Sequence, residues 1–91
     1  MSVEVDVLDC LQDIVEKVEE RPFVIDAFSS GTDAYIVVDI LAPPYVLKSI
    51  AETIELCLTE YRVKDKIDVR CGYLEDKDGE AIAVYYWLHV L

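Results

Sequence analysis

Glycine and proline are scarce in this sequence, with three residues of each among 91. So few glycines leave no glycine-rich loop that could cradle a phosphate group. The chain also lacks a G-x-S-x-G nucleophile elbow and an H-E-x-x-H metal motif, and it has a single histidine. These absences argue against a catalytic role, and we expect neither an enzyme activity nor a cofactor.

Basic residues are also few: eight lysines and arginines stand against 19 aspartates and glutamates, for a formal net charge of −11. Such a surface repels phosphate groups, which argues against direct nucleic-acid binding and against docking to an anionic membrane. The charge does not indicate disorder, because 54% of the residues are hydrophobic and 10% are aromatic. A chain this apolar can offset its ordering entropy by burial, so we expect a folded domain that spans residues 1–91.

Cysteine is limited to Cys10, Cys57 and Cys71, an odd number at wide spacing that forms neither a disulfide framework nor a C-x-x-C metal motif. We expect all three to act as small apolar core residues in a reducing compartment. No apolar run approaches the roughly 18 residues that a membrane-spanning helix needs. The acidic start Met1–Asp6 lacks the basic region of a signal peptide. A cytoplasmic location without membrane contact is therefore the expectation.

Hydrophobic spacing divides the chain into six elements. Apolar residues recur every three or four positions from Val7 to Val18, which predicts a helix that stops before Pro22. Pro43-Pro44 opens a second helix, and residues 78–79 (Asp-Gly) signal a hairpin turn. The predicted elements are a helix over Val3–Glu20, strands over Phe23–Phe28 and Asp33–Leu41, a helix over Pro44–Arg62, and strands over Ile67–Tyr73 and Ala81–Leu91.

This α-β-β-α-β-β order predicts an α+β, two-layer sandwich: a four-stranded, mainly antiparallel sheet with both helices on one face. The second and fourth strands are apolar on both faces, as central strands tend to be, so we expect the strand order 1-2-4-3. This topology resembles a circularly permuted ferredoxin-like sandwich.

Alternation along the strands assigns side chains to the two faces of the sheet. The residues expected toward the helices are Phe23, Ile25, Ala27, Ala34, Ile36, Val38, Ile40, Ile67, Val69, Cys71, Tyr73, Ile82, Val84, Tyr86, Leu88 and Val90. The residues expected to point away include Val24, Asp26, Phe28, Tyr35, Val37, Asp39, Asp68, Arg70, Ala83, Tyr85, Trp87, His89 and Leu91.

The second set contains an apolar, aromatic centre where a solvated sheet would carry threonine, lysine and glutamate. Contiguous apolar surface usually marks an interface, and tyrosine and tryptophan often carry binding energy. The leading hypothesis is a protein-interaction domain that homodimerises through Tyr35, Val37, Tyr85, Trp87 and His89. Alternatively, the first helix or the loop Glu75–Glu80 could fold over this face within one chain.

Two further hypotheses belong to other classes. An acidic stripe recurs at helical steps and consists of Asp6, Asp9, Asp13, Glu16 and Glu20. Such a stripe is typical of a solvated helix face. It is also typical of an inhibitor that imitates a nucleic acid and docks onto a basic protein groove. Asp26, Asp39 and His89 lie on the outward-facing side of the predicted sheet and could border a small-ligand or metal site. Their spacing forms no known motif, so we expect no metal.

Overall fold

The computed structural model describes residues 5–91, which form two helices and four strands. In chain order they are α1 (Val5–Val18), β1 (Val24–Ser30), β2 (Asp33–Asp39), α2 (Pro44–Glu60), β3 (Ile67–Glu75) and β4 (Ala81–Val90). The type and order of all six elements are confirmed. The predicted start of the first helix at Val3 lies outside the described residues.

Local backbone chemistry fixes the helix ends. Pro22 follows α1 and prevents its continuation, whereas Pro44 begins α2, where a missing N–H group removes no intrahelical bond. At the end of α2, Arg62 adopts a left-handed conformation with φ of 58°. The N–H of Val63 then donates to the Leu58 carbonyl at 3.0 Å. This is the Schellman arrangement, which satisfies carbonyl groups that the helix end leaves open.

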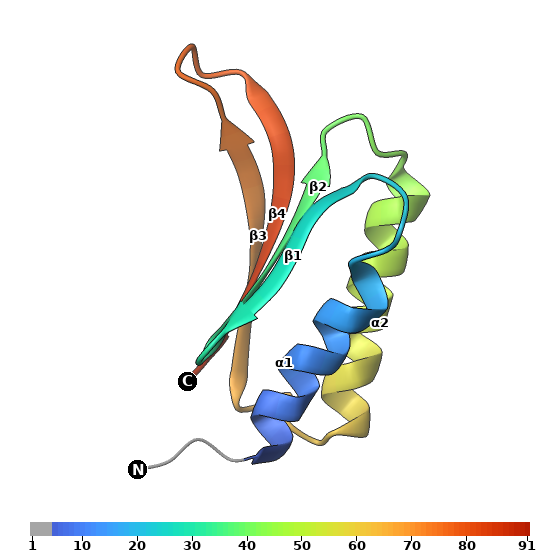
Figure 1. Cartoon of the computed structure of the whole chain (residues 1–91), viewed down its shortest axis with the longest axis vertical. Helices are drawn as coiled ribbons and strands as arrows, with labels where there is room; N and C mark the ends of the chain where they lie inside the picture. Colours follow the sequence, from blue (N-terminus) through green and yellow to red (C-terminus); the bar gives the residue numbers. More distant parts are fainter. Residues whose placement is uncertain (1–4) are drawn as a thin grey trace.

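The four strands form one sheet in the order β1-β2-β4-β3, and all three pairings are antiparallel. Both helices lie on the same side of the sheet (Figure 1). The fold class and the strand order are therefore as predicted. The tip of the β3–β4 hairpin extends beyond the helices in Figure 1, so part of the sheet has no helix beside it.

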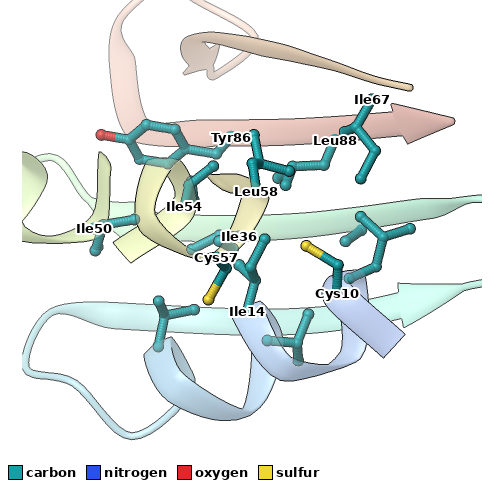
Figure 2. Close-up of a cluster of buried hydrophobic side chains, with 14 of the residues drawn as sticks. Cys10, Ile14, Ile36, Ile50, Ile54, Cys57, Leu58, Ile67, Tyr86 and Leu88 are labelled. Atoms are coloured by element: carbon teal, nitrogen blue, oxygen red, sulfur yellow. The ribbon is translucent and has the colours of Figure 1, made fainter. Parts of the chain in front are cut away.

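The core lies between the helices and the strands that they cover, and Figure 2 shows side chains of both helices and of the sheet gathered there. Its side chains come from the apolar stripe of each helix and from the helix-facing positions of β2 and β4. The Tyr86 hydroxyl donates to the Leu47 carbonyl of α2 at 3.2 Å, which satisfies the polar end of a buried ring. Buried residues include Val7, Cys10, Leu11, Ile14, Val18, Ala34, Ile36, Val38, Ile50, Ile54, Cys57, Leu58, Val63 and Leu88.

The helices cover only the start of β3, and this corrects part of the face assignment. Of the β3 residues expected toward the core, Ile67 is buried, but Val69, Cys71 and Tyr73 are exposed, Tyr73 at 65%. Cys71 is therefore not a core residue, in contrast to Cys10 and Cys57, which are buried. The expectation of inward packing was also wrong for Ile82, near the hairpin tip, and for Ile40, beyond the end of β2; both are exposed.

A β-bulge changes which residues of β1 face the core. Val24 pairs with Val38 and Asp26 pairs with Val37, so Ile25 is an extra residue without a partner of its own. As a result, Val24 packs against the core, whereas Ile25 is 60% exposed. The predicted alternation placed these two residues the other way round. Phe23, also expected inside, lies before the strand with φ of 69° and is exposed.

Candidate functional site

The face of the sheet that points away from the helices is here called the outer face. Residues paired across an antiparallel sheet share a face, so the strand register arranges the outer face in four rows that run across the strands. The members of each row are given in the order β1, β2, β4, β3. They are the first row (Ser30, Asp33, His89, Asp68), the aromatic row (Phe28, Tyr35, Trp87, Arg70) and the third row (Asp26, Val37, Tyr85, Gly72). The fourth row has no β1 residue and consists of Asp39, Ala83 and Leu74.

The aromatic row spans all four strands. The ring centroids of Phe28 and Tyr35 are 5.2 Å apart, and those of Tyr35 and Trp87 are 6.1 Å apart with nearly parallel planes. Arg70 ends the row, with its guanidinium carbon 5.7 Å from the centre of the Trp87 ring. These separations are within the range of favourable aromatic and cation–π contacts. The row thus forms a continuous π surface from one sheet edge to the other.

A shallow apolar hollow lies beside this row. It is lined by Tyr35, Val37, Leu74, Tyr85 and Trp87. Gly72 helps to shape it: a Cβ atom there would stand 2.9 Å from the Tyr85 ring, so the ring rests where a side chain of β3 would otherwise project. Tyr85 therefore leans across the β3 backbone and leaves the space beside Val37 open. Four of the five predicted interface residues, Tyr35, Val37, Tyr85 and Trp87, line this one hollow.

The fifth predicted residue, His89, belongs to a polar cluster in the first row. Asp33 accepts a hydrogen bond from the Trp87 indole N–H at 2.9 Å and lies 2.6 Å from Nδ1 of His89. The hydrogen bond from His89, followed by that from Trp87, holds the pKa of Asp33 below its usual value. This cluster fixes the Trp87 ring at the edge of the hollow. Sequence reasoning missed Asp33, although the predicted strand order places it beside β4.

Charge on the outer face is distributed unevenly. The β1–β2 half carries Asp26, Asp33 and Asp39 and no basic side chain. Within the four rows, the β4–β3 half carries Arg70 and His89 with a single acidic residue, Asp68, whose carboxylate pairs with Arg70 at 2.8 Å. One half is therefore acidic, and the other is close to neutral.

The structure does not bring together the three residues considered for a ligand or metal site. His89 pairs with Asp33 at one end of β2, whereas Asp39 pairs with Ala83 at the other end. Six residues of strand separate the two positions, which is about 20 Å. Throughout residues 5–91, no group of three histidine, cysteine, aspartate or glutamate side chains is arranged to hold a metal ion.

The acidic stripe on α1 is interrupted at its centre. Asp6, Asp9 and Glu16 are exposed on the helix, as is Glu20 just beyond it, but Asp13 is half-buried toward α2. There the carboxylate pairs with Lys17 at 3.2 Å and accepts a hydrogen bond from the Tyr61 hydroxyl at 3.5 Å. The stripe is thus two exposed pairs of carboxylates separated by a neutralised one.

The segments considered as internal covers lie elsewhere. α1 packs with α2 on the opposite side of the sheet, and residues 76–80 form the turn of the β3–β4 hairpin (Figure 1). In that turn, Asp76 accepts the backbone N–H groups of Asp78 and Glu80 at 2.9 and 3.0 Å. Phe28 accordingly remains 44% exposed at the β1 edge of the outer face.

Comparison with known proteins adds no family. No family model matches the chain, and no curated protein matches it at a significant level. Within the described part of the chain, neither helix has the length and apolar composition that crossing a membrane requires. The functional assignment therefore depends on the chemistry of the outer face.

Proposed function

We propose that this chain is an acidic protein-interaction domain that forms a homodimer through its outer face. The observation that carries the proposal is the aromatic row with its adjacent hollow, which together present Tyr35, Trp87 and Tyr85 on the side of the sheet that no helix covers. Water solvates such a surface poorly, and its burial in an interface is favourable. The outer-face charges lie around this apolar centre, as polar residues do at the rim of an interface.

The size of the outer face indicates how tightly two copies would bind. Four strands spaced by about 4.8 Å and about seven residues long give a flat area of about 450 Å² per copy. Two copies would bury at least about 900 Å², and more with the relief of the side chains, which is the size of weak or transient interfaces. A dimer with a micromolar dissociation constant is the expected result.

The proposal includes a cytoplasmic location. All three cysteines are free thiols, and one of them, Cys71, is exposed. Free thiols of this kind fit a reducing compartment, where disulfides are rare.

Sedimentation velocity between about 1 and 200 μM tests the proposal. We expect a concentration-dependent dimer that persists at high salt, because apolar contacts are not screened by ions. Trp87→Glu and Val37→Lys place charges in the hollow and should yield folded monomers. Leu56→Glu, at an exposed apolar position on α2, is the matched control and should leave the dimer unchanged. Equal assembly masses for the wild type and both outer-face variants would contradict the proposal.

A second candidate is an acidic protein that docks α1 onto a basic partner groove, supported by the exposed carboxylates of Asp6, Asp9, Glu16 and Glu20. Binding of this kind depends on charge and should weaken steeply as salt rises. A basic bait protein that binds at low salt, and loses binding when Glu16 and Glu20 become glutamine, would favour this candidate. A Trp87→Glu variant should bind the same bait normally.

A further inference from the structure

The outer face also contains information on how two copies are oriented, and this inference rests on the proposed homodimer. In the aligned packing of two sheets, a two-fold dimer that stacks two outer faces has its axis between the sheets, either across the strands or nearly along them. Each choice places a different set of rows and strands opposite one another. The known register of the four rows therefore allows the two arrangements to be compared residue by residue.

An axis across the strands places each strand over its own copy and reverses the order of the rows. Asp33 in the first row would then face Asp39 of the second copy, and Asp39 would face the second copy's Asp33. Both contacts bring two carboxylates close together at the edge of the interface. Like charges opposed in this way disfavour association.

An axis along the strands, midway between β2 and β4, keeps the rows in order and places β2 over β4 and β1 over β3. Asp33 then faces His89 of the second copy, and the symmetry repeats this contact. In the aromatic row, Tyr35 faces the second copy's Trp87, and Phe28 faces its Arg70. The acidic half of each face thereby meets the nearly neutral half of the other, which carries Arg70.

The remaining carboxylates also fit this second arrangement. Asp26 and Asp39 face Gly72 and Ala83 of the second copy, and Asp68 faces its Ser30, so no two carboxylates are directly opposed. We infer that the homodimer has its two-fold axis nearly along the strands between β2 and β4, with the aromatic row of one copy stacked on that of the other.

Distances between spin labels distinguish the two axes. Every labelled protein carries Cys71→Ser, which removes the exposed native thiol. Cys10 and Cys57 are kept, because both are buried and should not be labelled. A nitroxide at Thr32→Cys marks the exposed β1–β2 turn, and one at Asp78→Cys marks the exposed β3–β4 turn at the other end of the sheet. Each singly labelled protein is measured as a dimer by electron paramagnetic resonance, after sedimentation has confirmed its assembly mass.

The axis along the strands keeps equivalent turns at the same end of the dimer. With sheets about 10 Å apart and strands about 4.8 Å apart, the two Cα atoms of either labelled residue should be about 15 Å apart. The axis across the strands would separate them by about 28 Å at Thr32 and by at least about 40 Å at Asp78.

Short distances at both labelled positions support the inference. Long distances in a dimer that Trp87→Glu dissociates would overturn the orientation while leaving the proposed outer-face dimer intact. A monomer at every concentration, or a dimer insensitive to Trp87→Glu and Val37→Lys, would overturn the proposed function and the orientation together.

Discussion

Arg21 joins the α1–β1 connection to α2, and its removal is expected to destabilise the fold measurably. Its guanidinium donates to the Ser49 hydroxyl at 2.6 Å and to the Thr53 hydroxyl at 2.7 Å, both on α2. The Thr53 hydroxyl in turn donates to the Ser49 carbonyl, so it can only accept from the arginine. These bonds hold the α1–β1 connection against α2 across a sequence separation of 28 and 32 residues.

The magnitude follows from the number and environment of these bonds. A hydrogen bond to a charged group contributes about 1.5–3 kcal/mol when well buried, and Arg21 is half-buried, so about 1 kcal/mol for each bond is a suitable value. Arg21→Ala should therefore lower the free energy of unfolding by about 2 kcal/mol. For a domain of this size, that loss corresponds to a decrease in melting temperature of roughly 8–16 °C.

Urea unfolding followed by circular dichroism measures this loss. Arg21→Lys can keep only one of the two contacts and should lose about 1 kcal/mol, because an ammonium group lacks the planar fork of a guanidinium. Arg62→Lys is the matched control at an exposed position and should change little. A double-mutant cycle of Arg21→Ala with Thr53→Val should show a coupling energy. A loss below about 0.5 kcal/mol for Arg21→Ala would refute the reasoning.

Three further predictions concern a helix end, a titratable cluster and a thiol. Arg62→Gly should raise the free energy of unfolding by about 1 kcal/mol in urea titrations, because φ of 58° suits glycine better than arginine. The depressed pKa of Asp33, caused first by His89, means that its carboxylate stabilises the fold above the unfolded-state pKa of about 3.9 and that this contribution is lost as pH falls toward the folded-state pKa. Asp33→Asn should therefore flatten the decline in the free energy of unfolding below about pH 4. The same decline in the variant and the wild type would contradict this. In a native thiol assay, Cys71 should react quickly and the two buried cysteines slowly, since burial raises the pKa of Cys10 to about 12. Rapid reaction of all three thiols would show that the core opens readily.

The topology could be predicted because its signals are local. Pro22 and Pro44 mark helix limits through their own backbone chemistry, and the apolar spacing within α1 has only one periodicity that fits. The strand order followed from the two-sided apolar character of β2 and β4, which only central strands require. None of these inferences needed knowledge of which residues touch across the fold.

The errors came from features that depend on distant parts of the chain. The bulge at Ile25 changes the facing of one strand segment without a glycine or proline to announce it. The exposure of Cys71 and Tyr73 depends on how far the helices extend over β3, which strand alternation does not encode. Asp33 was missed for a related reason: its partners Trp87 and His89 are more than 50 residues away.

The outer face is the part of the molecule that the core leaves unexplained. Burial of Ile36 and Leu88 fixes the register of β2 and β4, because a slip of one residue would turn the core side chains outward. That constraint requires only that the alternate positions point away; it does not require them to be Tyr35 and Trp87. Threonine or lysine at those positions would preserve the same core and improve solvation. The aromatic row therefore needs a cause of its own, and the proposed burial against a second copy with complementary charge would supply one.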